Sequence, residues 1–203
     1  KYKENFFWEH IPDPTIETVT AAIRNQVRNH KITHVFYDYI FSSPSLLREF
    51  EGQQIREDVI LGMFSTKLKE LANELEVFLE SGTQLNRTWE TEAKTGIRNQ
   101  NMIRGATAII DKCDAGYITL PVMKGELEAL SGLIQQGGYK KPTHVTDIYK
   151  VRRGRYKDVR IWSAIDLGTC RMEDLFVTDA MFNEISIPIL KYQFTDWDEE
   201  DGN

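Results

Sequence analysis

Apolar residues recur at helical spacing in two segments, and each segment is followed along the chain by a short apolar run. The helical pattern predicts helices over residues 15–30 and 55–76. The run at 32–41, ITHVFYDYIF, is β-branched and aromatic and predicts a strand buried on both faces, and 76–84, EVFLESGTQ, predicts the next strand. A further strand is predicted at 6–11, FFWEHI. This order of strands and helices predicts an α/β layer with parallel strands.

The second half of the chain changes from helical spacing to alternation. Polar residues dominate 86–103, which predicts an exposed loop. Short helices are predicted at 104–114 and 124–136. The alternating runs predict a hairpin and an antiparallel edge, with strands at 115–122, 144–151, 159–168 and 173–179. One domain is therefore expected over 1–194, followed by an acidic, disordered tail at 195–203.

Charge is distributed unevenly along the chain. The 203 residues carry a net charge of -6, but residues 140–160 carry +6 and the remainder carries -12. Such a basic window predicts either a solvated hairpin or a surface that attracts anions. Cys113 and Cys170 stand alone, which favours a reducing compartment such as the cytoplasm. Apolar runs stay well below the roughly 20 residues that span a bilayer, so no membrane partner is expected.

Two polar residues at predicted strand ends are candidates for phosphate chemistry. Asp38 follows the apolar residues 35–37, where a buried carboxylate would need a cation or a donor. A position beyond the carboxyl end of a parallel strand suits hydrated magnesium, although a hydrogen-bonded structural aspartate is equally compatible. Gln84 closes the next strand, and its amide can contact a γ-phosphate or orient water.

Four segments resemble, in order, motifs of the DnaB-type replicative helicases, which are hexameric ATPases with a RecA-like core. SGTQLNR at 81–87 resembles their S-Q-L-N-R signature, and HVFYDYI at 34–40 is similar to their Walker B strand. IRGATAIIDKCD at 103–114 resembles their DNA-binding loop, and YKVRRG at 149–154 resembles the K-x-R-N-G of their arginine-finger hairpin. The four matches span nearly the whole chain.

The resemblance implies a fold and an activity. The fold expected from it is α/β, a partial RecA-like core with a mostly parallel sheet flanked by helices and an antiparallel hairpin near the C-terminus. The activity is ATP-dependent unwinding of DNA, with 5′ to 3′ translocation on single-stranded DNA by a homo-hexamer. ATP and Mg²⁺ are the implied cofactors, and primase and a helicase loader are the implied further partners.

The resemblance also assigns roles to individual residues. Asp38 corresponds to the Walker B acid, which holds magnesium through water. Gln84 corresponds to the residue that couples the nucleotide to the DNA-facing loop. Lys150 and Arg152 correspond to the pair that reaches a neighbouring subunit's ATP, where a planar, permanently charged guanidinium can contact two phosphate oxygens.

The DNA-binding loop of the family corresponds to Arg104, Gly105, Ala106 and Thr107. Small residues there let main-chain N–H groups approach backbone phosphates without base preference. The chain departs from the family at three positions: Gly105 replaces a glutamate, Thr107 a glycine, and Arg153 in the hairpin an asparagine. These departures favour a phage or mobile-element origin.

No G-x-x-x-x-G-K-[ST] phosphate-binding loop occurs in the 203 residues. The chain is therefore expected to be the C-terminal part of a helicase motor, lacking the Walker A region and inactive by itself. The alternative is a non-catalytic RecA-like remnant that binds or regulates a partner ATPase. A recombinase or circadian-type RecA relative is a third possibility, against which the T-Q-L-N-R run and the K-x-R hairpin argue.

Overall fold

The computed structural model describes residues 5–96, 98–104, 106–154 and 157–186. For Ala106 and Thr107 it describes the backbone alone. The predicted tail at 195–203 and the last residues of the predicted domain, 187–194, lie outside the described part. No described helix is long and apolar enough to cross a bilayer.

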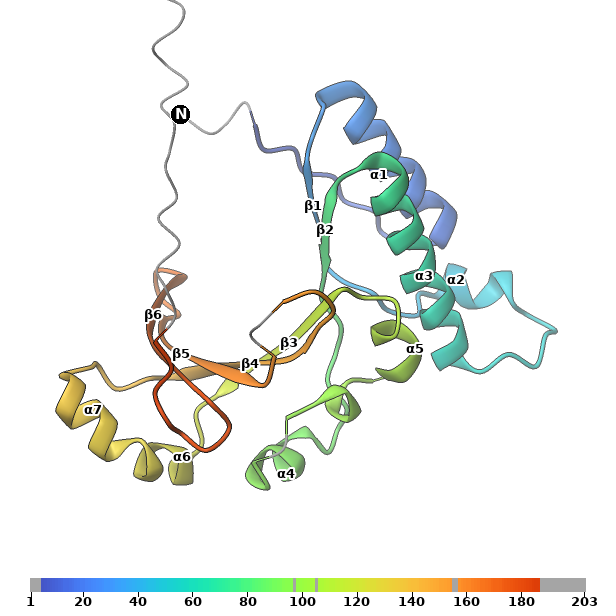
Figure 1. The fold of residues 1–203 in the computed structure, drawn as a ribbon. Coiled ribbons are helices and arrows are strands. Elements are labelled where there is room, and N and C mark those ends of the chain that lie inside the picture. The colour runs from blue at the N-terminus through green and yellow to red at the C-terminus, as the bar shows by residue number, and fades with distance from the viewer. Residues whose placement is uncertain (1–4, 97, 105, 155–156, 187–203) are drawn as a thin grey trace, which may run out of the picture.

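Two separate sheets form the framework (Figure 1). Strands β1 (His34–Tyr37) and β2 (Phe78–Ser81) pair in parallel. Strands β3 (Ala115–Pro121), β4 (His144–Val151), β5 (Val159–Asp166) and β6 (Arg171–Thr178) form an antiparallel sheet in that order.

The expectation of a partial RecA-like core with a mostly parallel sheet is wrong for the described residues. Among the described strands, only β1 and β2 pair in parallel, and the long helical connection between them gives the crossover that parallel pairing requires. The connections from β4 to β5 and from β5 to β6 are short, so those strands turn back on their predecessors. The predicted C-terminal hairpin is therefore part of a sheet larger than the parallel one.

Three helices accompany the parallel sheet: α1 (Ile16–His30), α2 (Pro44–Glu49) and α3 (Glu57–Leu75). Figure 1 shows α1 and α3 on one side of β1 and β2. Apolar side chains from these helices form the core with Ile40, for example Val19 and Phe64. A capping box at Thr15 starts α1, because its hydroxyl accepts from the N–H of Thr18.

The opposite face of the parallel sheet is open among the described residues. Phe36 of β1 is 69% exposed and Phe78 of β2 is 53% exposed. Exposure alternates along β1, so the expectation that this strand is buried on both faces is wrong. The predicted strand at 6–11 is also absent, since that segment forms no described ladder and leaves Trp8 exposed.

The polar segment 86–103 is folded rather than a free loop. It contains α4 (Trp89–Lys94) and the 3₁₀ helix η1 (Gln100–Met102). Their apolar side chains pack beneath β3 in a second cluster, which includes Ala93, Met102 and Ile118. Ala93 and Met102 are almost completely buried in this cluster, and Trp89 of α4 packs against it while partly buried.

Short helices complete the fold. Helix α5 (Ala106–Ile110) lies against α3, where Ser65 Oγ donates to the carbonyl of Ile109 at 2.8 Å. The predicted helix at 124–136 is divided into α6 (Lys124–Ala129) and α7 (Ser131–Gly137). Leu130 lies at the division and packs with Trp162 in a third cluster against the antiparallel sheet.

Candidate functional site

The carboxyl ends of β1 and β2 meet at one edge of the parallel sheet. Asp38 follows β1 directly, and Gln84 lies three residues after β2. The N–H of Ile40 donates to the carbonyl of Gly82 at 3.1 Å, which joins the two segments beyond the strands. Gln84 Nε2 donates to the hydroxyl of Tyr39 at 2.7 Å. The structure thus brings together the strand ends that the sequence singled out.

Asp38 is exposed, so the argument from a buried, desolvated carboxylate does not apply to it. None of the described residues donates a hydrogen bond to its side chain. Within the described part of the chain, no group of three or more His, Cys, Asp or Glu residues is arranged to hold a metal. One accessible carboxylate fits Mg²⁺, which keeps several waters and takes phosphate oxygens as further ligands. The residues around Asp38 do not by themselves fit the triphosphate of a nucleotide, because the 203 residues contain no G-x-x-x-x-G-K-[ST] loop to cradle it beside Asp38.

Arg104 is held beside Gln84 by main-chain pairing. Its N–H donates to the carbonyl of Gln84 at 2.9 Å. Leu85 and Ile103 form an antiparallel bridge next to this bond, and the N–H of Asn86 donates to the carbonyl of Met102 at 2.7 Å. The T-Q-L-N segment and the start of the predicted DNA loop therefore form one paired unit.

The side chain of Arg104 borders a shallow pocket. Its Nη2 lies 3.1 Å from Glu57 Oε1, and Ser42 Oγ donates to the same carboxylate. Arg104 remains 58% exposed, so its guanidinium is accessible to a ligand. The pocket is lined by residues from both strand ends and from α3: Ile40, Phe41, Ser42, Glu57, Leu61, Thr83, Gln84 and Arg104.

The rest of the predicted DNA loop is only partly described. Gly105 lies outside the described residues. Ala106 and Thr107 form the first turn of α5, two residues beyond Arg104. The loop thus leads straight into a short helix, and Arg104 is the only one of its four predicted residues whose side chain is described.

Lys150 and Arg152 contact the C-terminal end of α5 in their own chain. Lys150 Nζ donates to the carbonyl of Ile110, and Arg152 Nη2 donates to the carbonyl of Asp111 at 3.0 Å. Arg152 also lies 3.4 Å from Asp114 Oδ1, and its N–H donates to the carbonyl of Asp114 at 2.7 Å. The last carbonyls of a helix have no partner inside the helix, so these cations satisfy them.

Asp114 is shared between two elements. Lys69 of α3 pairs with its Oδ2, while Arg152 approaches its Oδ1. The hydrogen bond from Lys69, followed by the charges of Lys69, Arg152 and Arg153, lowers the pKa of the Asp114 carboxyl. Asp114 is therefore ionised at neutral pH. No sequence motif pairs Lys69 with Asp114, because 45 residues separate them.

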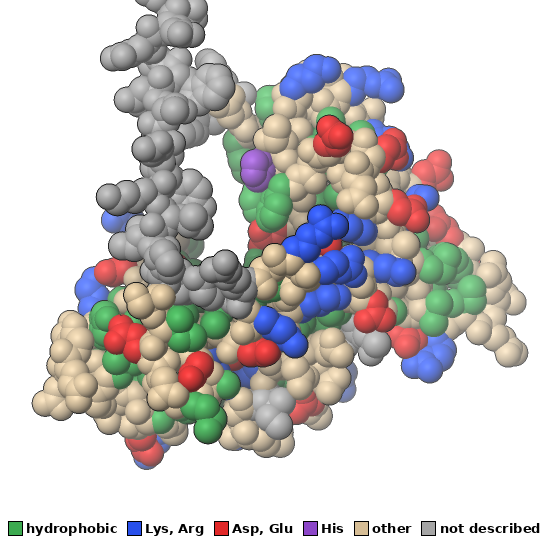
Figure 2. Space-filling model, in the orientation of Figure 1, with side chains coloured by type: hydrophobic (Ala, Val, Ile, Leu, Met, Phe, Trp, Pro, Cys, Tyr) green, Lys and Arg blue, Asp and Glu red, His purple; other side chains and the backbone are tan. Residues whose placement is uncertain are grey.

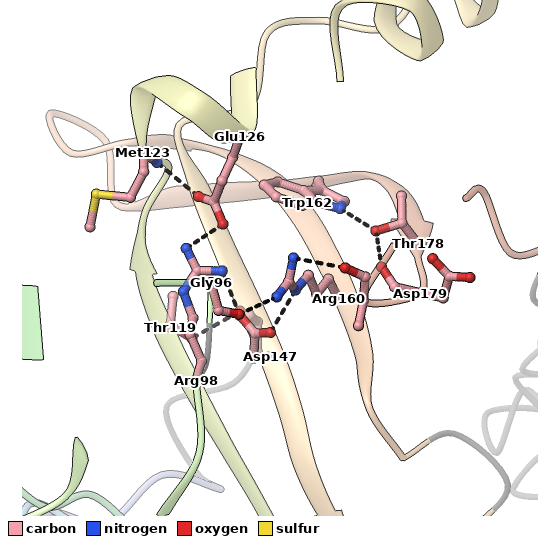
Figure 3. A network of polar contacts seen from close by, with 12 residues as sticks. Gly96, Arg98, Thr119, Met123, Glu126, Asp147, Arg160, Trp162, Thr178 and Asp179 are labelled. Atoms are coloured by element: carbon pink, nitrogen blue, oxygen red, sulfur yellow. Dashed lines mark hydrogen bonds and ion pairs between the residues drawn. The ribbon is translucent and has the colours of Figure 1, made fainter. Parts of the chain in front are cut away.

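A buried network of charges centres on Asp147 and Arg160, which face each other on β4 and β5 (Figure 3). Asp147 of β4 accepts from Arg98 Nη1 and from Arg160 Nε, each at 2.9 Å. Arg98 also pairs with Glu126 of α6 at 2.6 Å, and Arg160 Nη2 donates to the carbonyl of Gly96 at 2.8 Å. Burial raises the pKa of Asp147, and the two guanidinium groups oppose that rise.

The network was not predicted from the sequence. The only signal was a carboxylate within the otherwise β-branched and aromatic run HVTDIYKV. Arg98 is 49 residues from Asp147 and lies in the segment predicted to be a loop. The network connects that segment and α6 to strands β4 and β5 of the antiparallel sheet. Its role is therefore structural.

Comparison with known proteins gives one named relative and no family. No family model matches the chain. Over 181 residues the chain is 36% identical to "SPbeta prophage-derived uncharacterized protein YorI" of Bacillus subtilis (strain 168). The match includes 87% of this chain but spans only 36% of the length of the relative. The chain is thus similar to about a third of a longer, uncharacterised prophage protein.

Proposed function

We propose that this chain is part of the motor of a hexameric, ATP-dependent replicative DNA helicase of the DnaB type. In this proposal the ring moves 5′ to 3′ on single-stranded DNA and unwinds the duplex. Primase and a helicase loader are its proposed partners, and ATP and Mg²⁺ are required. The order of the four motif-like segments supports the proposal, as does the meeting of Asp38 and Gln84 at one sheet edge.

The observation that carries the proposal is the pair of bonds made by Gln84. Its side chain donates to Tyr39, next to Asp38, at 2.7 Å. Its carbonyl accepts from the N–H of Arg104 at 2.9 Å. Gln84 is therefore bonded on one side to the strand end proposed for magnesium and on the other to the segment proposed for DNA. A helicase requires such a connection, because hydrolysis at one site must alter the grip on DNA at another.

In the proposal, the cationic site residues replace contacts within their own chain by contacts with DNA or nucleotide phosphates. Arg104 exchanges Glu57 for a DNA phosphate, which costs little because the ion pair is exposed. Asp38 would hold a hydrated magnesium ion through water, and the ion would offset negative charge on phosphate oxygens. Lys150 and Arg152 exchange carbonyls of their own chain for phosphate oxygens of a neighbouring subunit.

The relative gives modest further support. It is named as a prophage-derived protein, and a phage genome is where the proposed replication helicase would be encoded. Its length also leaves room for a phosphate-binding loop in a longer chain, since the match spans 36% of it. The proposed ATPase therefore belongs to a longer protein, and this segment contributes DNA contacts and cations.

Binding of single-stranded DNA tests the proposal. Fluorescence anisotropy with a labelled oligothymidylate measures the affinity of the chain and of Arg104→Ala. We expect the substitution to weaken binding about tenfold, because it removes an exposed phosphate contact. Arg48→Ala is the matched control, since Arg48 is equally exposed and forms one ion pair, with Asp13 at 3.4 Å. Equal affinities of the two variants, or a preference for duplex DNA, would contradict the proposal.

A further inference from the structure

A cluster of four cations surrounds Asp114 beside the end of α5. Lys69 and Arg152 pair with its two carboxylate oxygens. Arg153 is near enough for its charge to stabilise the ionised carboxylate, and Lys150 lies against the carbonyl of Ile110. Figure 2 shows Lys and Arg side chains gathered in the middle of the drawn face, where Figure 1 places α3 and the segment after α5.

The cluster contains more positive charge than its own structure neutralises. Lys69, Lys150, Arg152 and Arg153 contribute four positive charges, and ionised Asp114 contributes one negative charge. Asp111 and Lys112, both exposed in the same turn, offset each other. A net charge of about +3 is thus concentrated at one place on a chain whose total charge is -6.

Fixed contacts hold these cations close together despite their mutual repulsion. The carbonyls of Ile110 and Asp111 anchor Lys150 and Arg152. Lys69 is held from the other side, because it projects from α3, which packs against α5. Arg152 remains 47% exposed, and no described residue accepts a hydrogen bond from the side chain of Arg153. Lys69 and Arg152 are therefore held in place, while the exposed guanidinium of Arg153 keeps its donors available to a ligand.

We propose that Lys69, Arg152 and Arg153 form a binding site for a chain of phosphates, and that Lys69 is a phosphate-contacting residue of this site. The proposal deepens the proposed function, on which the identity of the ligand rests. The ligand is the triphosphate of a nucleotide held by a neighbouring copy. The helicase resemblance assigned phosphate contacts to the hairpin alone, whereas the structure adds a cation from α3.

The chemistry favours a polyphosphate over a single carboxylate or sulfate. A triphosphate carries several negative charges along a short chain, so its oxygens can contact more than one cation at once. The guanidinium of Arg152 can contact two oxygens in one plane, while the ammonium of Lys69 acts as a point charge. The carboxylate of Asp114 already lies between these two groups, with one oxygen toward each, so both cations face a common anion.

Isothermal titration calorimetry of the chain with inorganic tripolyphosphate at low salt tests the proposal. We expect binding, and we expect Lys69→Gln and Arg152→Gln each to weaken it about fivefold. Lys67→Gln is the matched control. Lys67 lies on the same helix two residues away and pairs with Glu70 at 2.9 Å, outside the cluster. Circular dichroism checks that each variant is folded.

The possible outcomes separate this proposal from the proposed function. Weakening by Lys69→Gln and Arg152→Gln, with Lys67→Gln unchanged, supports the phosphate site. Absence of binding at millimolar tripolyphosphate, or equal weakening by all three substitutions, overturns it. A second titration measures binding of an oligothymidylate. If Lys69→Gln weakens binding of the oligothymidylate but not of tripolyphosphate, Lys69 contacts DNA and the proposed phosphate site is overturned. The DNA measurement on Arg104→Ala is independent, so either proposal can fail without the other.

Discussion

The main-chain N–H of Arg104 donates to the carbonyl oxygen of Gln84, with 2.9 Å between the two atoms. This bond joins the segment after the second strand of the parallel sheet to the segment that leads into α5. Because Gln84 also bonds Tyr39, hydrogen bonds connect both strand ends to Arg104. Lys150 and Arg152 contact the opposite end of α5, so both proposed phosphate contacts adjoin one five-residue helix.

The chain by itself is expected to show no DNA-stimulated ATPase activity. Asp38 and the cations of the hairpin are present, but no glycine-rich loop is available to bind the β- and γ-phosphates. Release of inorganic phosphate, measured with and without single-stranded DNA, checks this. DNA-dependent release that disappears in Asp38→Ala would show that the chain holds a complete site. Asp38→Ala should leave the unfolding midpoint unchanged, because Asp38 is exposed.

Gly62→Ala is expected to destabilise the packing of α5 on α3. A Cβ at Gly62 would lie 2.5 Å from Cβ of Ala108, closer than two carbon atoms that are not bonded to each other can approach. The resulting shift should lower the free energy of unfolding by about 1–2 kcal/mol, after the gain in helix propensity is subtracted. Urea unfolding followed by circular dichroism measures it.

Gly125→Ala serves as the control for that substitution. Gly125 lies in α6 and has no heavy atom within 4 Å of an added Cβ. The same chemical change should therefore leave stability unchanged or raise it slightly, through reduced flexibility of the unfolded chain. An equal loss of stability in both variants would show that the contact between α3 and α5 is not the cause.

Asp147→Asn is expected to cost about 3 kcal/mol of stability. The substitution removes the negative charge between Arg98 and Arg160, both buried, and leaves two guanidinium groups with less compensation. Asp174→Asn on β6 of the same sheet is the control, because Asp174 is exposed and accepts from Ser163 at 2.8 Å. Its cost should stay below about 1 kcal/mol. Similar urea midpoints for the two variants would contradict a stabilising role of the network.

The pKa of Asp114 is expected to depend on Lys69. Carbon NMR of the carboxyl group during a pH titration should give a pKa below the ordinary value of about 4, because Lys69 bonds the ionised form. Lys69→Gln should return this pKa toward its ordinary value, whereas Lys67→Gln should not change it. The folded-state pKa is lowered, so the contribution of this pair to stability is present above pH 4. It is lost as the pH falls through the lowered pKa.

Local patterns predicted the individual elements well. Helical spacing placed the helices that the structure has at Ile16–His30 and Glu57–Leu75, and alternation placed the strands of the hairpin. These predictions succeed because each element must bury one face, whatever it packs against. The segment 86–103 was misjudged because its buried residues are few and irregularly spaced.

The candidate site was predicted in part. Asp38 and Gln84 lie at adjoining strand ends as expected, because parallel strands bring their carboxyl ends to one edge. The roles of Asp38, Gln84, Lys150, Arg152 and Arg104 remain predictions. Glu57, Lys69 and Asp114 were not foreseen, since each meets its partner across more than forty residues of chain.

The sequence by itself determined where most helices and strands lie, which two strand ends carry polar residues, and where positive charge is concentrated. These are local properties of spacing and composition. Only the tertiary structure decided that the strands divide into a small parallel sheet and a larger antiparallel one. It also decided that Lys69 joins the hairpin cations and that Asp147 lies between two arginines. Such pairings depend on register and on close packing between distant segments, which no local pattern specifies.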